Sequence, residues 1–502
     1  MKWQDTSEEK KGIWILLALM TMKVIMQYLL IHPSYDLHRD EYLHLDQANH
    51  LAWGFISVPP FTSWVAWLIK ALGNDVFWVK FFPAFFGALT VYFSWKIAEE
   101  LGGKLFAKVI VALAIIFSAI LRLNTLFQPN SFEIFFWTAF YYFLVRYVNR
   151  QKPVDLYIMA FVLALAFLNK YNVLFLVAGL VPGLLISPER RLLMSKHVWF
   201  ALVLFLFLIH RNIIWQINNG IPFFKHMKEL ADTQLVNMSR ADFIREQFLF
   251  FLNSIFLLII AFIGFFRYRP FKPYRFIFLG FVITIVLYVY FRAKGYYSIG
   301  LYPVLLAFGA VYFEHLTFRR NYLRVASAAF LLLMFLPFLR LAFPYMKAEK
   351  MVAESTIYRE AGLLKWEDGR EHHIQQDFAD MLGWRELAYK VDSAVNSLKE
   401  KDKVLILTNN YGQAGAINFY TINNIQAVSF NADYLNWFPV GKPIQHVIRV
   451  MEPDYDDDDP GRTQERSLCD TLILAGEITN NIARERGTKI WVMKNVNAEV
   501  WP

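Results

Sequence analysis

Residues 13–50 read IWILLALMTMKVIMQYLLI, an apolar run, and then HPSYDLHRDEYLHLDQANH, a run crowded with ionisable side chains. The apolar part is about nineteen residues long, which is enough for a helix to cross a bilayer. A simple connector between two membrane helices has no need of several carboxylates and imidazoles within a few residues. We therefore predict a spanning helix over 13–31 and a candidate functional site in the loop after it, with a plain solvated loop as the alternative.

The composition indicates the same class of protein along the whole chain. Of 502 residues, 56% are hydrophobic, 18% are aromatic and only 19% are charged, and the apolar residues occur in long runs. Soluble proteins of this length carry more charge, so we expect an all-α polytopic membrane bundle. The net charge of +9 lies mainly in short loops between apolar runs, which favours a topological origin over nucleic-acid binding. The single cysteine excludes an internal disulfide and a cysteine-based metal site.

The apolar runs predict about eleven membrane-spanning helices. They cover residues 13–31, 76–97, 105–121, 132–148, 154–168, 171–186, 198–214, 248–266, 276–291, 299–313 and 323–343. Between the first two, residues 61–72 are amphipathic and rich in tryptophan, with Pro59 and Pro60 before them and Gly73 after them. This pattern is typical of a helix that lies in the membrane interface.

Basic side chains set the expected orientation of these helices. One alternate set of loops holds most of the lysines and arginines, such as Lys104 and Arg190, whereas the other set holds few apart from residues 225–245. Loops rich in lysine and arginine stay on the cytoplasmic side. We therefore expect a multi-pass protein of the cytoplasmic (inner) membrane with a cytoplasmic N-terminus, and with the loop at 36–46 and everything after Pro344 outside.

The chain changes character after its last apolar run. Residues 345–502 are polar and sufficient for one small domain, so we divide the chain into a membrane domain at 1–344 and an extracytoplasmic domain at 345–502. Strands are expected at 403–408, 471–474 and 490–493, and helices at 414–420 and 479–486. This alternation predicts a small C-terminal α/β soluble domain. The acidic run at 454–458 fits a solvated loop better than a calcium site.

Asp40 and Glu41 are the candidate catalytic residues of the acidic loop. A reaction at the outer membrane surface needs a carboxylate base to activate a hydroxyl acceptor and a cation or metal ion beside the departing phosphate. Adjacent residues of a helix point about 100° apart, so the two carboxylates are expected to act differently, with Asp40 as base or acceptor contact. The alternative is an acidic pair that suits a helix N-terminus and nothing more.

A divalent metal ion is a second open alternative at this loop. Glu41 and His44 stand three residues apart, so one helical face could offer both to a metal, with His38 and His50 nearby in sequence. The pattern lacks the tight spacing of a dedicated metal motif, and no cofactor is certain from the sequence.

Cationic side chains at the ends of the apolar runs are candidate phosphate ligands. A single cation at a helix end most often reaches the lipid headgroups. Several on the side of the acidic loop favour a cradle for the phosphate of a lipid-carried donor. We assign donor-phosphate binding to Lys170, Arg211, Arg292 and Lys294. The other candidates for the substrate cavity are Asp36, His38, Arg39, Tyr42, Tyr171, His210, Tyr296 and Tyr297.

Short motifs follow one another in order along most of the chain. They are Asp40-Glu41, Trp53-Gly54 with Pro59-Pro60, residues 82–90, Leu168-Asn169-Lys170-Tyr171, Lys294-Gly295-Tyr296-Tyr297 with Tyr302-Pro303, and residues 410–416. Together they resemble the bacterial family 39-type glycosyltransferases, membrane enzymes of GT-C architecture related to dolichyl-phosphate-mannose protein mannosyltransferases and aminoarabinose lipid A transferases. Where many members of that family have an acidic residue near a helix start, this chain has Asn130 and then Glu133.

The resemblance implies an activity and its partners. It implies transfer of a sugar from a polyprenyl-phosphate donor to a lipid, glycan or protein acceptor at the outer membrane face, among membrane lipids and without nucleic acid. It also implies that Asp40 is catalytic or contacts the acceptor, and that Lys170 and Lys294 bind the donor phosphate. An inverting glycosyltransferase is therefore the leading hypothesis. A lipid-linked sugar flippase or transporter is the alternative, and a membrane-anchored binding protein is a third.

Overall fold

The computed structural model describes residues 6–233, 235–439, 441–453 and 462–497, so the acidic run at 454–458 lies outside the described residues. Its contacts group into two compact units, each made of several pieces of the sequence. The first consists of Met1–Leu29, Ala52–Thr62 and Phe77–Phe343, and the second of Leu30–Leu51, Ser63–Val76 and Pro344–Pro502. The second unit thus contains the acidic loop together with the C-terminal region. The domains predicted at 1–344 and 345–502 stay a prediction.

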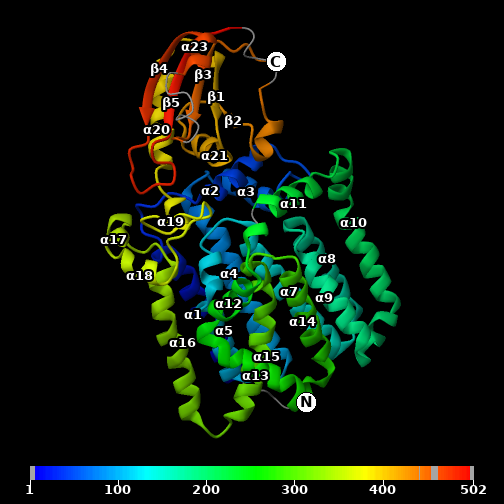
Figure 1. Ribbon diagram of the computed structural model, residues 1–502. Coiled ribbons are helices and arrows are strands. Elements are labelled where there is room, and N and C mark those ends of the chain that lie inside the picture. The colour runs from blue at the N-terminus through cyan, green and yellow to red at the C-terminus, as the bar shows by residue number, and fades with distance from the viewer. Residues whose placement is uncertain (1–5, 234, 440, 454–461, 498–502) are drawn as a thin grey trace. The chain divides into compact units, whose positions relative to one another are not determined.

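The first unit is built of helices, and every predicted apolar run overlaps one or two of them (Figure 1). They are α1 (Thr6–Leu29), α4 (Val76–Glu100), α5 (Leu105–Ile116), α6 (Ala119–Leu123), α7 (Pro129–Arg150), α8 (Pro153–Asn169), α9 (Val173–Ile186), α10 (Lys196–Asn218), α11 (Pro222–Thr233), α12 (Arg240–Phe250), α13 (Ile255–Arg267), α14 (Arg275–Tyr290), α15 (Tyr302–Leu316) and α16 (Asn321–Ala342). The short 3₁₀ helix η6 (Gly295–Leu301) precedes α15. The chain is therefore mostly helical, as predicted.

The number of spanning helices differs from the prediction. Among the described residues, six helical segments are long and apolar enough to cross a membrane, and two bent pairs bring the number to eight. The predicted count of eleven is not confirmed, in part because two of the predicted runs form shorter apolar helices, Leu105–Ile116 and Pro153–Asn169. After α9 the chain turns by 112° into residues 188–194. Pro188, which has no N–H to donate and disfavours helix at the residue before it, follows this break.

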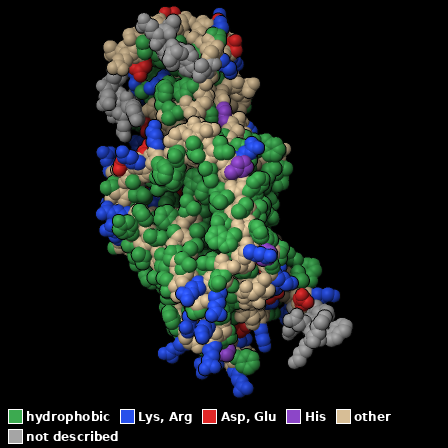
Figure 2. All heavy atoms as spheres, turned by 90° about the vertical axis from the view of Figure 1, so that its right-hand side faces the viewer, with side chains coloured by type: hydrophobic (Ala, Val, Ile, Leu, Met, Phe, Trp, Pro, Cys, Tyr) green, Lys and Arg blue, Asp and Glu red, His purple; other side chains and the backbone are tan. Residues whose placement is uncertain are grey.

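The surface of the first unit is suited to lipid. Figure 2 shows a broad hydrophobic face with lysine and arginine side chains gathered toward its lower end. On α10, Trp199, Val203 and Phe207 are exposed, at spacings of four residues that place them on one side of the helix. Apolar side chains exposed along a helix of this length are expected in contact with a bilayer.

Helices α9 and α14 approach each other through glycines. A Cβ atom added to Gly179 would lie 2.0 Å from Thr284 Oγ1 and 2.6 Å from the carbonyl oxygen of Gly280. One added to Gly183 would lie 2.8 Å from the backbone nitrogen of Gly280. Glycines spaced by four residues let two helix backbones come together. Such close packing is common in membranes, because the hydrophobic effect does not drive one apolar helix against another in lipid.

The second unit contains shorter helices and a five-stranded sheet. Its helices are α2 (Arg39–Asp46), most of α3 (Phe61–Ala71), α17 (Ala348–Ala353), α18 (Ser355–Glu360), α19 (Gln376–Ala379), α20 (Trp384–Asn396), α21 (Tyr411–Tyr420) and α23 (Thr463–Ser467). The strands β1 (Val404–Thr408), β2 (Ala427–Ser429), β3 (His446–Met451), β4 (Cys469–Glu477) and β5 (Lys489–Val496) have the order β2-β1-β3-β5-β4. Strand β1 is parallel to its neighbours β2 and β3. Strand β5 is antiparallel to its neighbours β3 and β4.

The predicted strands and the helix at 414–420 are confirmed, but the helix predicted at 479–486 is wrong. Those residues form turns that connect the antiparallel strands β4 and β5. Ile478 and Thr488 close the connection, because Ile478 N donates to Thr488 O and Gly487 N donates to Ile478 O. Antiparallel neighbours need only a loop between them, whereas the crossover helix that we expected belongs to parallel strands.

The change Gly179→Leu tests the close approach of α9 and α14. A leucine side chain cannot fit against the α14 backbone, so we expect the variant to lose about 1–3 kcal/mol of stability through overpacking. The thermal unfolding midpoint of the purified protein in detergent measures this loss. The matched control is Val181→Leu on the same helix, where the side chain is 39% exposed and an added methylene has room. Equal midpoints for the two variants would contradict the packing described here.

Candidate functional site

The acidic loop folds into α2, which begins with a reciprocal pair of hydrogen bonds. The His38 ring accepts a hydrogen bond from the backbone nitrogen of Asp40 at 3.2 Å, and Glu41 Oε2 accepts one from the backbone nitrogen of His38 at 2.6 Å. This capping box satisfies two N–H groups that the first turn of a helix leaves without partners. Glu41 is buried, and this contact gives it a structural role. Its predicted catalytic role stays a prediction.

Asp40 is held from the C-terminal region of the same unit. The Tyr411 hydroxyl donates a hydrogen bond of 2.6 Å to Asp40 Oδ1. The Arg39 guanidinium lies over the Tyr411 ring, 4.5 Å from its centroid. Burial alone raises the pKa of Asp40, but His38, the hydrogen bond from Tyr411 and Arg39 outweigh it and lower the pKa below its ordinary value. Asp40 is therefore an ionised carboxylate at neutral pH.

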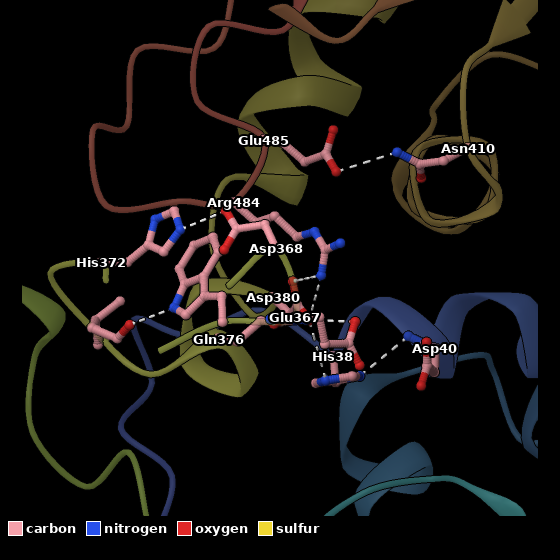
Figure 3. Close-up of polar contacts among 12 residues, drawn as sticks. His38, Asp40, Glu367, Asp368, His372, Gln376, Asp380, Asn410, Arg484 and Glu485 are labelled. Atoms are coloured by element: carbon pink, nitrogen blue, oxygen red, sulfur yellow. Dashed lines mark hydrogen bonds and ion pairs between the residues drawn. The ribbon is translucent and has the colours of Figure 1, made fainter. Parts of the chain in front are cut away.

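Further polar contacts of the second unit lie near Asp40, and Figure 3 shows those that link His38, Asp380 and Arg484. Arg484 Nη1 lies 3.2 Å from Asp380 Oδ1, and His38 Nε2 lies 3.9 Å from Asp380 Oδ2. Gln413 donates a hydrogen bond of 2.6 Å to Glu485, whose pKa is raised by burial and by the charge of Glu452. Asp380 thus has two cationic neighbours within this unit, and Glu485 has an amide partner.

Asp36 acts as a cap for α20. Its Oδ2 accepts hydrogen bonds from the backbone nitrogens of Trp384 at 3.0 Å and Arg385 at 3.2 Å, and its Oδ1 pairs with Arg385 Nε at 3.0 Å. A carboxylate at a helix N-terminus satisfies free N–H groups and interacts favourably with the helix dipole. The structure therefore gives this buried residue a structural contact, while its predicted place in the substrate cavity stays a prediction.

The remaining predicted residues of α2 face the C-terminal region. Tyr42 is fully buried, and its hydroxyl donates to the Tyr420 hydroxyl at 3.3 Å. His44 Nδ1 bonds Gln47 Oε1 at 3.2 Å, and burial lowers the pKa of this histidine. Within the described residues, no group of three or more His, Cys, Asp or Glu side chains is arranged to hold a metal ion. The predicted Glu41–His44 metal pair has separate protein partners and stays a prediction.

Lys170 is the centre of a second polar cluster, in the first unit. It follows the last residue of α8, and its Nζ lies 2.7 Å from Asn130 Oδ1 and 3.3 Å from Glu133 Oε2, both from the first turns of α7. The ammonium also lies 4.2 Å from the centroid of the Tyr297 ring and 5.6 Å from that of Tyr296. An ion pair and two aromatic faces thus fix a cation at the end of a membrane helix.

A further set of contacts orients this cluster. Asn172 Nδ2 donates to Glu133 Oε1 at 2.7 Å and to the carbonyl oxygen of Tyr297 at 3.0 Å, while the Tyr288 hydroxyl donates to Asn172 Oδ1 at 2.8 Å. Lys294 lies within electrostatic range of Lys170. Glu133 and Asn172 were not among the predicted site residues. The signal for Glu133 was a carboxylate near the start of an apolar run, where the resemblance places an acidic residue.

The other predicted cations are not part of this cluster. Arg211 is exposed, and its guanidinium lies 5.6 Å from the Trp53 ring. Arg292 is exposed in a left-handed backbone conformation, with φ of 53°, and donates to the carbonyl oxygen of Val236. His210 is exposed and bonds the carbonyl oxygen of Phe207. Their predicted roles at a substrate site stay predictions.

Tyr171 belongs to a separate chain of polar contacts. Its hydroxyl donates to Asn212 Oδ1 at 2.9 Å and accepts from Gln216 Nε2 at 3.0 Å. Asn212 Nδ2 in turn donates to the carbonyl oxygen of Trp53 at 2.6 Å. This chain ties α10 to the segment that carries the Trp-Gly motif, where a Cβ on Gly54 would lie 2.4 Å from the Trp215 ring.

Part of the sequence matches known proteins. Residues 57–215 match the family model described as dolichyl-phosphate-mannose-protein mannosyltransferase. The lipid A galacturonosyltransferase RgtD of Rhizobium johnstonii is 24% identical over 248 residues, which are 48% of this chain and 51% of that protein. The chain thus spans about half the length of this curated relative.

The fold also has relatives among solved structures. Two crystal structures of ArnT from Cupriavidus metallidurans, one bound to undecaprenyl phosphate and one in the apo state, match with TM-scores of 0.66 and 0.64. Their sequence identities are 13% and 12%, and each match covers 98% of this chain and 99% of that chain. At this identity the likeness is one of fold. The resemblance to GT-C glycosyltransferases that the motifs predicted is confirmed.

The change Asp36→Ala tests the structural role of Asp36. Losing the cap of α20 and the pair with Arg385 leaves buried N–H groups without acceptors, so we expect a loss of about 1–3 kcal/mol. The thermal unfolding midpoint in detergent reports it. As a control, Glu371→Gln removes a carboxylate that is 63% exposed and should leave the midpoint almost unchanged. An unaltered midpoint for Asp36→Ala would contradict the capping role.

Proposed function

We propose a function that follows from the likeness of this chain to the GT-C glycosyltransferases. The chain transfers a sugar from a polyprenyl-phosphate donor to an acceptor at the outer face of the cytoplasmic membrane, with inversion at the sugar. The observation that carries this proposal is the carboxylate of Asp40 at the start of α2, which accepts a hydrogen bond of 2.6 Å from the Tyr411 hydroxyl. The ArnT structure with undecaprenyl phosphate supports the class of donor, and the name of RgtD, a lipid A galacturonosyltransferase, supports a lipid acceptor.

Asp40 serves as the base or the acceptor contact. The acceptor hydroxyl must lose its proton as the new glycosidic bond forms, and an ionised carboxylate can accept it. Attack from the side opposite the phosphate inverts the configuration of the sugar. His38, Arg39 and Tyr411 keep Asp40 in its ionised form before an acceptor arrives.

Lys170 serves the phosphate of the donor. Phosphate leaves with its negative charge, and a fixed ammonium stabilises that charge in the transition state. Glu133 holds the ammonium in place through an ion pair at 3.3 Å, and the Tyr296 and Tyr297 rings lie over it. The Lys170 side chain is 19% exposed, so a ligand can still reach its ammonium beside the buried Glu133. Lys294 adds a second positive charge within electrostatic range.

The alternative from the sequence, a lipid-linked sugar flippase, is not favoured by the relatives, which are named as transferases. The product of the reaction separates the two functions. A transferase makes a new glycosidic bond, whereas a flippase moves the labelled lipid between leaflets and makes none. A membrane fraction that contains lipids, glycans and proteins tests all three classes of acceptor in one assay. The chemical form of the label after the reaction then identifies the class.

The change Asp40→Asn tests the base. We expect sugar transfer to fall by about 10²–10⁴-fold, the usual contribution of general base catalysis. The assay uses proteoliposomes, labelled undecaprenyl-phosphate sugars and a native membrane extract, with folding checked by gel filtration and thermal midpoint. Asp402→Asn, an exposed aspartate of the same unit, is the control. Transfer at the wild-type rate by a folded Asp40→Asn protein would refute the role of Asp40.

The Lys170 site requires a double variant, because Lys170→Met alone leaves Glu133 buried without its cation. The pair Lys170→Met with Glu133→Gln removes both charges, which limits the loss of stability. We expect the donor KM to rise about 10–100-fold, because a hydrogen bond to a charged group contributes about 1.5–3 kcal/mol. Glu133→Gln alone is the matched comparison, since it keeps the ammonium. Unchanged values of both kcat and donor KM in the double variant would exclude Lys170 from a role at the donor phosphate.

A further inference from the structure

We infer that Tyr411, at the start of α21, is a positioning residue that holds the Asp40 carboxylate in its working orientation. The C-terminal region would then be part of the catalytic machinery and more than a cover for it. This inference rests on the proposed function of Asp40. Tyr411 lies 371 residues after Asp40 in the sequence.

The hydrogen bond between the two side chains carries the inference. Its length of 2.6 Å is that of a charge-assisted bond between a hydroxyl donor and a carboxylate acceptor. A carboxylate without such a bond rotates about its last side-chain torsion, which is broad and roughly two-fold. With Oδ1 engaged by Tyr411, the plane of the carboxyl group is set. A base so fixed does not have to reorient when the acceptor hydroxyl arrives.

Hydrogen bonds of Asn410 and Gln413, which lie on either side of Tyr411 in the sequence, fix its position. Asn410 caps α21, because its side chain accepts a hydrogen bond of 3.0 Å from the backbone nitrogen of Gln413. Asn410 and Gln413 both donate to Glu485, at 3.3 Å and 2.6 Å, and Glu485 is only 3% exposed. The first turn of α21 therefore cannot rotate without breaking buried hydrogen bonds. The tyrosine ring that it carries is correspondingly rigid.

Arg39 packs against the face of the Tyr411 ring. Its guanidinium lies 4.5 Å from the ring centroid, and its Nε has no hydrogen-bond acceptor among the described residues. Its charge is balanced instead by the surrounding Asp40, Asp380 and Glu485. A cation over the ring face restricts the ring while leaving its hydroxyl for Asp40.

Two glycines let α21 approach α2 closely enough for this contact. A Cβ on Gly412 would lie 2.5 Å from Arg39 Cγ, and a Cβ on Gly415 would lie 2.8 Å from Tyr42 Cβ. Any larger residue at either position would push the two helices apart. The sequence from Asn410 to Gly415 thus combines a cap, the tyrosine and two points of close approach within a single stretch.

The test is Tyr411→Phe in the full-length protein, assayed as described for Asp40→Asn. A positioning role predicts that kcat falls about 10–100-fold, the value of a hydrogen bond to a charged group, while the donor KM stays the same. The acidic limb of the pH profile should also move to higher pH. The Tyr411 hydrogen bond lowers the pKa of Asp40, so its loss raises that pKa and the base becomes protonated earlier as the pH falls.

Tyr420→Phe is the matched control, because it removes a hydroxyl from the same helix that bonds Tyr42 instead of Asp40. The acidic limb of this variant should stay in place. A second readout needs no substrate. Infrared difference spectra between each protein and its Asp40→Asn counterpart follow the Asp40 carboxyl band, and its titration should move upward in Tyr411→Phe only.

The outcomes separate the two proposals. If Asp40→Asn is inactive but Tyr411→Phe keeps both the wild-type kcat and the wild-type titration of Asp40, the positioning role of Tyr411 is overturned and the function of Asp40 stands. If folded Asp40→Asn transfers sugar normally, the function of Asp40 falls, and the inference about Tyr411 falls with it. A purely structural role would lower the thermal midpoint of Tyr411→Phe without moving the Asp40 titration, and would also overturn the inference.

Discussion

The second unit depends on the need to pair buried carboxylates. Taking an ionised carboxylate out of water costs several kcal/mol unless another charge or several hydrogen bonds replace the lost hydration. The buried Asp36 and Asp46 have Arg385 and Asn418 as partners, and the half-buried Asp40 has Tyr411. Because all three partners come from the C-terminal region, these contacts tie the acidic loop and α2 to that region. The fold of the acidic loop is therefore set by electrostatics as much as by apolar packing.

The first unit satisfies a similar requirement among apolar helices. Polar groups inside a membrane bundle have few alternatives to partners within the protein. Lys170 finds Glu133 and Asn130, and Lys23, which is fully buried in the first apolar run, donates to Asn124 Oδ1 at 2.8 Å. These contacts are specific in direction, whereas the contact of an apolar helix with lipid is not. They give the bundle a unique arrangement at positions where apolar packing alone would leave freedom.

The sequence was sufficient to predict local structure where one residue type or one period dominates. Long apolar runs marked the helices, and the short β-branched run at 403–408 marked the strand β1. The helix expected at 479–486 is a turn instead, since it joins antiparallel strands and sends Glu485 inward to Gln413. That burial depends on a partner about 70 residues away in sequence, which no local pattern contains.

Candidate site residues could be predicted by type but not by partner. The density of charge drew attention to the acidic loop, and Lys170 stood out as a cation between two apolar runs. The sequence did not show where each side chain points or which residue it contacts. His210 is on an exposed side of α10. Arg292 has a left-handed backbone, and its guanidinium bonds the carbonyl oxygen of Val236. Neither placement follows from sequence spacing. The sequence analysis included Tyr411 only as part of the motif at residues 410–416, because its contact is with a residue 371 positions away.

The discontinuous second unit has a consequence for how the protein is made. The acidic loop leaves the ribosome early, but Arg385 lies 349 residues after Asp36. At about 5–20 residues per second, translation supplies this partner roughly 20–70 s later. During that interval the carboxylates of the acidic loop lack these partners, while the helices after it are being made. The segment of this unit that is synthesised first is thus completed last, when the C-terminal residues arrive.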